Sequence, residues 1–276
     1  MINKDIIVGC MSGYMPEAIK PWVNSIQRCG FEGDKYVISF GLPDETIQYL
    51  KDGGFEIHHF KQGNRHIVVE RFYALYELLK EFESKSIKYR YIITTDVKDV
   101  IFQRNPSEWL SKFLTTHDCL VSSECLTYEN EDWGNNNLMV SYPHLYESNK
   151  NNIIYNAGTI AGEVSYMKDF FLHIFHLSLM GQDMQPDQAA MNILIHMKPF
   201  KQNTLFAWQK DGWCCQLGTT LDPKIRDKYS GRLWEPPPYY SDNGIVFNPN
   251  NNQPFHLVHQ YDRVPELKEK IIEKYL

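Results

Sequence analysis

Apolar and polar positions along the first third of the chain follow the periods of strands and helices in turn. Runs typical of buried strands occupy residues 5–11, 35–41, 55–60 and 89–95. Between them lie amphipathic helices, in which apolar side chains recur every three or four positions, at residues 16–30, 44–54 and 68–82. Strands that alternate with helices at this spacing predict a parallel sheet with helices on its faces.

After residue 99 the pattern is less regular, and the tail from Lys210 is rich in Gly, Pro and Asn, as is typical of loops. The remaining predicted elements are strands at residues 118–124, 156–162 and 255–263 and helices at residues 166–180, 186–197 and 264–276. No internal repeat and no linker-like change of composition divides the 276 residues. We therefore expect a single domain of the α/β class.

Composition limits the classes of function. The chain is 43% hydrophobic and 22% charged, as ordinary globular proteins are, and its formal net charge is −6. Nucleic-acid-binding domains are usually basic, so this charge argues against a nucleic-acid partner. An anionic small ligand stays possible, because a bound metal ion can supply the local positive charge.

The cysteines and the lengths of the apolar segments indicate in which cellular compartment the protein is expected. The chain has six cysteines, none in a C-x-x-C pair or a paired zinc spacing: Cys10, Cys29, Cys119, Cys125, Cys214 and Cys215. We expect free thiols, as in a reducing compartment. No apolar run approaches the ~20 residues that a membrane span needs, and no secretory signal is recognisable. The sequence thus predicts a cytoplasmic protein without a membrane span, and it leaves the oligomeric state open.

Two acidic residues follow the fourth predicted strand. Asp96 and Asp99 stand three positions apart in the segment YIITTDVKDVIF, between two apolar runs. In an open α/β sheet, ligands bind at the carboxyl ends of the parallel strands. Mg²⁺ and Mn²⁺ prefer oxygen ligands, often carboxylates together with phosphate. The pair is therefore a candidate metal site, and a solvated turn or the N-cap of a helix at residues 97–102 are the alternatives.

Small residues mark two further candidate segments. VGCMSGY, after the first strand, contains Gly9, Cys10 and Met11, and its glycines allow the backbone to approach a ligand. It does not match the G-x-G-x-x-G fingerprint, so a plain turn is the alternative. NAGTIAG sets Asn156 before small residues, which permits a ligand to pack closely against the backbone.

Two later segments combine charged and amide side chains. PDQAAMNIL opens a helix with Asp187 and Gln188, although an acid in a first helical turn is expected from the helix dipole alone. HLVHQYDR groups His259 with Asp262 and Arg263, and arginine is suited to diphosphate recognition. His256 and His259 would face opposite sides of a strand. A structural role for either histidine is the alternative.

Together these segments resemble the GT-A type of nucleotide-sugar glycosyltransferase, including glycogenin-like enzymes. YIITTDVKDVIF looks like the family's D-x-D metal motif with one extra spacer, and NAGTIAG resembles its N-A-G segment at the donor-sugar pocket. DQAAMNIL resembles its D-Q-x-x-x-N helix, and HQYDR stands where the family places a late metal-binding histidine. The resemblance spans residues 5–263. It implies one GT-A domain with a Rossmann-like mixed sheet and helices on both faces, a nucleotide-binding half at about residues 1–100 and a donor-sugar and acceptor half at about residues 101–276.

The resemblance also implies the activity: metal-dependent transfer of a sugar from a nucleoside diphosphate to a hydroxyl of a glycan or other acceptor. Mn²⁺ or Mg²⁺ would be bound by Asp96, Asp99 and His259, with Asp99 favoured as the direct ligand and Asp96 on the metal or the ribose. UDP is favoured over GDP, and retention of configuration is weakly favoured over inversion. Aromatic segments at residues 206–215 and 234–240 are candidates for an acceptor platform, with ordinary packing as the alternative.

The same resemblance assigns the other site residues. Asp187 would bind the donor sugar or, in an inverting enzyme, act as the catalytic base. Arg71 would reach the diphosphate from its helix, unless it is a surface arginine. The residues expected to bind the nucleotide sugar are Gly9, Cys10, Met11, Arg71, Asp96, Asn156, Ala157, Gly158, Gln188 and Arg263.

Two other functions remain open. A nucleotidyltransferase also needs a metal and a nucleotide, but GCMSGYMPEAIKP lacks the arginine that would bind a triphosphate. A non-catalytic carbohydrate-binding protein on a transferase fold is the second alternative, and the intact set of candidate ligands counts against it.

Overall fold

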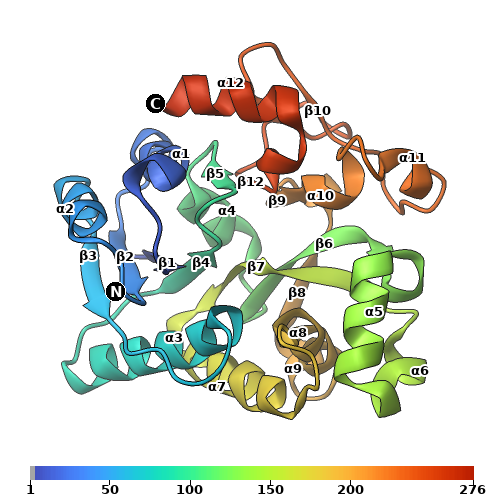
Figure 1. The fold of residues 1–276 in the computed structure, drawn as a ribbon, viewed down its shortest axis with the longest axis horizontal. Coiled ribbons are helices and arrows are strands. Elements are labelled where there is room, and N and C mark those ends of the chain that lie inside the picture. The colour runs from blue at the N-terminus through green and yellow to red at the C-terminus, as the bar shows by residue number, and fades with distance from the viewer. Residues whose placement is uncertain (1–3) are drawn as a thin grey trace.

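The computed structural model describes residues 4–276, so residues 1–3 of the expected nucleotide-binding half lie outside the described residues. Its centre is a mixed seven-stranded sheet (Figure 1), in which only β7 is antiparallel to its neighbours. The strand order is β3 (Glu56–His59), β2 (Asp34–Ser39), β1 (Ile6–Met11), β4 (Tyr91–Thr95), β7 (Ile153–Glu163), β6 (Cys119–Thr127) and β8 (Thr204–Ala207).

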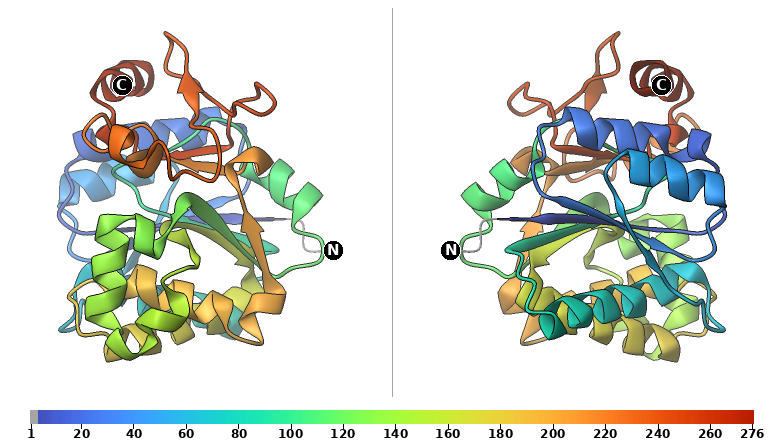
Figure 2. Two further views of the ribbon diagram at one scale, coloured as in Figure 1. Left: turned by 90° about the vertical axis from the view of Figure 1, so that its right-hand side faces the viewer. Right: turned by 90° about the vertical axis from the view of Figure 1, so that its left-hand side faces the viewer.

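Helices cover both faces of this sheet, which Figure 2 shows edge-on between two helical layers. Successive strand residues point to opposite sides. Ile7 therefore packs in one core with Trp22, while its neighbour Ile6 packs in another with Phe72. The first face carries α1 (Pro16–Arg28), α2 (Asp44–Asp52) and α4 (Pro106–Phe113), and the second carries α3 (Ile67–Ser84), α7 (Val164–Met180) and α8 (Asp187–His196).

A smaller sheet joins distant parts of the chain. Its order is β5 (Val100–Phe102), β12 (Leu257–His259) and β9 (Cys214–Gln216). β12 is antiparallel to β5, and the register sets His259 opposite Val100. Since Val100 follows Asp99 directly, this pairing brings the late histidine to the acidic segment. The helix considered for residues 97–102 is thus not formed, because this segment is a loop followed by β5.

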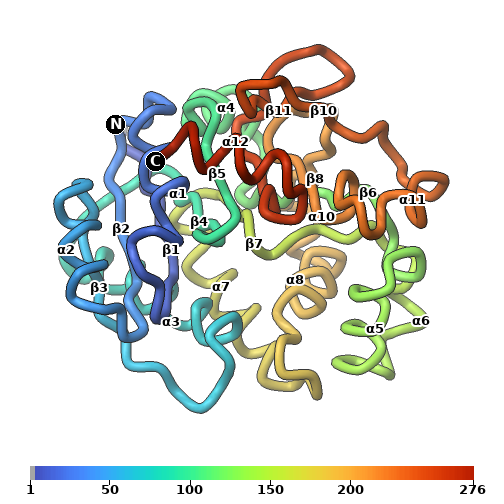
Figure 3. The backbone as a smooth tube through the Cα atoms, turned by 45° about the horizontal axis from the view of Figure 1, so that its top comes forward, coloured from blue at the N-terminus to red at the C-terminus, as the bar shows by residue number. Residues whose placement is uncertain are grey.

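The C-terminal helix returns to the start of the chain, and Figure 3 shows it beside α1. Asn24 Nδ2 donates a hydrogen bond of 2.6 Å to the carbonyl of Tyr275. The other elements are α5 (Asp132–Ser141), α6 (Tyr146–Asn149), α9 (Phe200–Asn203), α10 (Leu217–Thr220), α11 (Arg226–Tyr229), α12 (Pro265–Tyr275), β10 (Tyr239–Tyr240), β11 (Val246–Phe247) and 3₁₀ turns at Tyr128–Asn130, Pro143–Leu145, Gln209–Asp211 and Tyr261–Arg263.

The expected fold class is confirmed: the chain forms one α/β domain with a mixed, Rossmann-like sheet and helices on both faces. The six cysteines are free, as expected. Across residues 4–276, the helices are each too short or too polar to cross a bilayer. The sequence pattern misses α5, whose segment DWGNNNLMVS has little apolar periodicity. The buried side chain of Glu131 defines its start instead, since it accepts the N–H of Trp133 at 3.2 Å.

Candidate functional site

The loop between β4 and β5 holds Asp96 and Asp99 at the junction of the two sheets. Asp96 N donates to the carbonyl of Gly158 on β7 at 2.7 Å, and Gln260 N, after β12, donates to the carbonyl of Asp99 at 2.8 Å. Below the loop, Trp22 Nε1 donates to Thr95 Oγ1 at 2.8 Å. These bonds tie the loop to three parts of the fold, so the two carboxylates are held in place by the scaffold.

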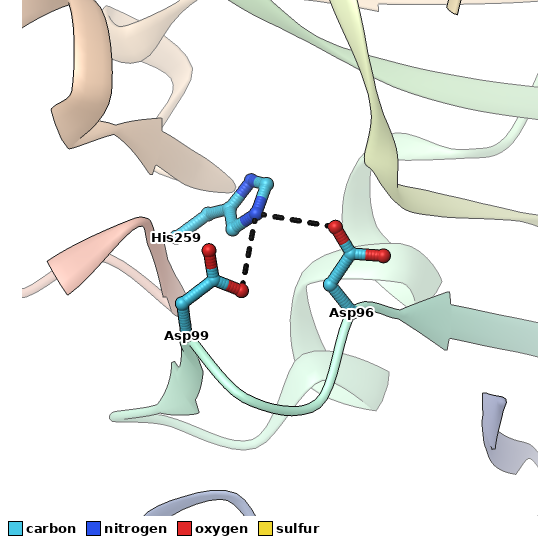
Figure 4. A group of neighbouring side chains, drawn as sticks. All are labelled: Asp96, Asp99 and His259. Carbon is cyan, nitrogen blue, oxygen red and sulfur yellow. Dashed lines mark ion pairs between the residues drawn. The ribbon is translucent and has the colours of Figure 1, made fainter. Parts of the chain in front are cut away.

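His259 completes a compact group with these two carboxylates, shown in Figure 4. Its Nε2 lies 3.5 Å from Asp96 Oδ2 and 3.5 Å from Asp99 Oδ1. All three candidate ligand atoms lie within 4.8 Å of one another. The histidine is buried, whereas both carboxylates are partly open to the cleft. The structure therefore brings together the three residues that the sequence nominates for a metal.

A chain of hydrogen bonds behind His259 orients the imidazole ring. His259 Nδ1 lies 2.7 Å from Gln216 Oε1, and Gln216 Nε2 donates to Thr159 Oγ1 at 3.1 Å. An amide oxygen accepts only, so Nδ1 carries the proton and Nε2 is directed at the carboxylates. Gln216 was not identified from the sequence, because its link to His259 depends on the pairing of β9 with β12.

The two carboxylates favour a positive charge between them, as the pKa values of the group indicate. Burial disfavours the imidazolium, yet Asp99 and Asp96 outweigh it and raise the pKa of His259 to about 10. Burial likewise opposes ionisation of Asp96, but Arg71 and His259 together lower its pKa. Two carboxylate oxygens and an imidazole nitrogen suit Mn²⁺ or Mg²⁺, and a divalent ion bound at Nε2 would replace the imidazolium proton.

Gln216 gives a first testable prediction. Replacing Gln216 by leucine removes the acceptor that fixes the tautomer of His259. We expect Mn²⁺ affinity, measured by isothermal titration, to fall by about 10- to 100-fold, as for other residues that orient metal ligands. The exposed Gln48→Leu is the matched control and should bind like the wild type. Unchanged affinity in Gln216→Leu would mean that this hydrogen bond does not orient the ligand.

Arg71 joins the acidic group to Asp187. The guanidinium of Arg71, on α3, donates to Asp96 Oδ1, to Asp187 Oδ2 at 2.9 Å and to the carbonyl of Ala157 at 3.1 Å. Its side chain is only 12% exposed, so it is not a surface arginine. Burial and the nearby Asp96 raise the pKa of Asp187, and Arg71 partly offsets them. Asp187 lies at the start of α8, where its carboxylate faces Arg71.

A polar cavity of about 450 Å³ opens beside this group. Asn156 Nδ2 and Gln188 Nε2 both donate to Glu124 Oε1, at 2.7 and 3.1 Å. Gln188 Oε1 accepts the N–H of Ala157 at 3.2 Å, which fixes the orientation of its amide. The cavity is thus lined by fixed hydrogen-bonding groups from β6, β7 and α8.

Gly158 lies between the acidic group and Asn156 in the lining of this cavity. A β-carbon at Gly158 would lie 2.5 Å from Asp96 Oδ2, 2.7 Å from His259 Cε1 and 2.9 Å from Asn156 Oδ1. Only glycine leaves room for these three side chains to converge. Asn156 Oδ1 also accepts the N–H of Gly158 at 2.6 Å.

A second cavity, of about 340 Å³, lies on the other side of Asp96 and Asp99. Cys10 lines it, and burial raises the pKa of the Cys10 thiol to about 12, so the thiol stays protonated at neutral pH. Arg263 lines both cavities. The neighbours of Cys10 pack inward instead: Gly9 faces Val97 and Trp22, and Met11 is fully buried in the core.

Glu124 is a site residue that sequence reasoning missed. It is 4% exposed and lines the larger cavity. Burial and the nearby Glu131 raise the pKa of Glu124 to about 7, although Asn156 and Gln188 work against this rise. Glu124 ends the strand predicted at residues 118–124, so the reasoning that singled out Asp96 could have found it.

The raised pKa of Glu124 predicts how stability depends on pH. Between its usual 4.5 and about 7, the folded protein binds a proton that the unfolded chain releases, so the free energy of unfolding falls as pH rises through this window. The full effect is at most about 3 kcal/mol. We expect Glu124→Gln, which lacks this carboxyl, to gain stability relative to the wild type between pH 5 and pH 8 in chemical denaturation. The exposed Glu269→Gln should show the same difference at both pH values.

Comparison of the chain with models of known protein families, and with curated protein sequences, finds no match. The function is therefore inferred from the residues and geometry of the site.

Proposed function

We propose that the protein is a metal-dependent glycosyltransferase, which moves a sugar from a nucleoside diphosphate to the hydroxyl group of an acceptor. One observation carries this proposal: Asp96 and Asp99 line two neighbouring cavities, and His259 lines the larger of them. A nucleoside-diphosphate sugar has the same order of parts, with the diphosphate between the nucleoside and the sugar. The diphosphate then lies where a divalent ion would be held.

The acidic group and Arg263 would hold the diphosphate. Asp96, Asp99 and His259 would hold the metal ion, which would supply Lewis-acid stabilisation of the charge that develops on the leaving diphosphate. The carboxylates of Asp96 and Asp99 both face His259, and that of Asp96 is also paired with Arg71. This difference supports Asp99 as the dedicated ligand. Arg263 lines both cavities and would contact the diphosphate.

The larger cavity suits the sugar. Sugar hydroxyls both donate and accept hydrogen bonds, and Asn156, Gln188 and Glu124 offer both kinds of partner at fixed positions. Glu124 uses Oε1 for the two amides, which leaves Oε2 for a ligand in the cavity. With a pKa of about 7, Glu124 can exchange a proton with a hydroxyl at neutral pH. Asp187, whose Oδ2 accepts Arg71, is better suited to positioning that guanidinium.

A screen of nucleotide sugars tests the proposal. With Mn²⁺ or Mg²⁺, we expect slow hydrolysis of one donor, which would identify both its base and its sugar. Asp99→Asn should abolish this hydrolysis, since it replaces a carboxylate ligand by a neutral amide. Release of pyrophosphate from a nucleoside triphosphate, with no hydrolysis of any nucleotide sugar, would favour a nucleotidyltransferase instead.

A further inference from the structure

Glu124 is a buried carboxylate with one oxygen fixed and the other free. Its Oε1 accepts Asn156 Nδ2 at 2.7 Å and Gln188 Nε2 at 3.1 Å. Among residues 4–276, none donates a hydrogen bond to Oε2, although the residue is only 4% exposed and lines the larger cavity. Because Oε1 faces the wall that carries both amides, Oε2 points toward the rest of the cavity. A buried polar atom without a partner indicates a ligand that supplies one.

The backbone around Glu124 departs from regular strand geometry. Pairing of β6 with β7 is irregular between Ser123 and Thr127. Within this interval Cys125 has a left-handed conformation, with a φ of 63°. That conformation is strained for a residue other than glycine. Bulges redirect side chains, and strained residues of this kind cluster at active sites. The bulge therefore points to a functional requirement for the direction of the Glu124 side chain.

Hydrogen bonds from two later segments hold this bulge. Thr219 Oγ1, on α10, donates to the carbonyl of Glu124 at 2.9 Å. Trp234 N donates to the carbonyl of Cys125, also at 2.9 Å. α10 begins directly after Gln216, which orients the candidate metal-binding histidine. One short segment thus fixes both Glu124 and a candidate metal ligand.

The other acids that line the cavity make other contacts. Asp187 is paired with Arg71. Glu131 accepts backbone N–H groups at the start of α5, and Asp222 accepts a backbone N–H within its own turn. The two remaining acids belong to the candidate metal group. Glu124 combines a free oxygen with a side chain that two neighbouring amides hold in place.

We propose that Glu124 is the catalytic base: its Oε2 takes the proton of the acceptor hydroxyl, so that the transfer is a single displacement with inversion of configuration. This inference rests on the proposed function. The acceptor oxygen forms a bond to the anomeric carbon of the sugar, and its proton passes to Oε2. The electron pair of the broken bond leaves with the diphosphate. The resemblance favours retention instead, which would need either a second displacement or attack from the side of the leaving group.

Two observations favour a base over a nucleophile that attacks the sugar itself. A sugar bound by Asn156 and Gln188 would lie against their wall, whereas Oε2 points away from it, toward the space left for the acceptor hydroxyl. Burial and the nearby Glu131 also raise the pKa of Glu124 to about 7. A base is most effective with a pKa near the working pH, whereas a nucleophilic carboxylate must stay ionised.

The anomeric configuration of the product is the first test. With Mn²⁺ and the donor identified by the hydrolysis screen, proton NMR spectroscopy follows the sugar that is transferred to water. Stoichiometric protein at 5 °C makes its release faster than the exchange of its anomers. An α-linked donor should yield the β-anomer first. A first product with the configuration of the donor would overturn the inference and keep the transferase, and no hydrolysis of any nucleotide sugar would overturn both.

Substitution of Glu124 gives the second readout. Glu124→Ala should lower donor hydrolysis at least ~100-fold, and added formate, a small base that fits the vacated space, should restore part of it. Glu124→Gln should be equally inactive but not restored, because its amide fills that space. Both variants should keep metal-dependent stabilisation by UDP or GDP, and the exposed Glu269→Ala should behave as the wild type. No restoration by formate, or a sugar ester on Glu124 detected by mass spectrometry, would overturn the assignment.

Discussion

Gly158→Ala should abolish metal-dependent nucleotide binding while the protein still folds. The added methyl group would meet Asp96 Oδ2, His259 Cε1 and Asn156 Oδ1, all between 2.5 and 2.9 Å away. All three are side-chain atoms, so the backbone of β7 can stay in place while the ligands move. We expect the affinity for Mn²⁺ to fall at least ~100-fold, since two of the three ligands are displaced. The cost to stability should be about 1 to 3 kcal/mol, as in other overpacked cores.

Gly231→Ala is the matched control, because a β-carbon there would meet no atom within 4 Å. It should bind Mn²⁺ like the wild type. Wild-type binding by Gly158→Ala would show that Asp96 and His259 do not act together on one ion. Isothermal titration with Mn²⁺, alone and with UDP or GDP, measures both variants.

Arg71→Met should destabilise the metal-free protein strongly. It leaves the carboxylates of Asp96 and Asp187 without their shared cation, and Asp187 is only 8% exposed. Removing one partner of a buried ion pair typically costs 3 to 5 kcal/mol. We expect ~3 kcal/mol, at the low end, because the Asp96 side chain is 38% exposed and therefore partly solvated. Chemical denaturation in the presence of a chelator measures this loss.

The double variant Arg71→Met/Asp187→Asn shows how much of the lost stability is due to the unpaired charge of Asp187 and how much to lost packing of the Arg71 side chain. It removes the charge of the buried Asp187, which has lost its cation, so it should recover part of the loss. Lys85→Met is the surface control: it breaks an exposed pair with Glu81, which should cost under ~1 kcal/mol. If Arg71→Met were no more destabilising than Lys85→Met, the guanidinium would not be holding the two acids in the folded state.

The local parts of this structure could be predicted from the sequence, because strands and helices follow from hydrophobic periodicity. The positions of Asp96 and Asp99 at a strand end were predicted on the same basis. The reversed direction of β7 could not be, since alternation of side chains does not depend on the direction of a strand. α5 also escaped detection, because its polar sequence is stabilised by the cap at Glu131 and by packing of residues such as Leu138.

The other residues of the site come together through pairing of strands that are distant in the sequence. His259 lies next to Asp99 because of the register in which β12 pairs with β5. That register cannot be predicted from the periodicity of apolar residues along the chain. The same holds for Gln216, which is brought to His259 by β9. Gly9 is a residue that the sequence suggested for ligand binding and that tertiary packing covers. The side chains of Val97 and Trp22 fill the space next to its Cα. The resemblance thus suggested the chemistry of the site, and the pairing of distant strands determines which residues come together there.

The most direct test of the central claim is thermal unfolding with Mn²⁺ and a nucleoside diphosphate, for the wild type and Asp99→Asn. A ligand that binds the folded state adds about 2.7 kcal/mol of apparent stability at 100 times its Kd. We predict that UDP or GDP stabilises the wild type only when the metal is present, and that Asp99→Asn loses this effect. No stabilisation by any nucleoside diphosphate with Mn²⁺ or Mg²⁺, or an equal effect in Asp99→Asn, would contradict the account.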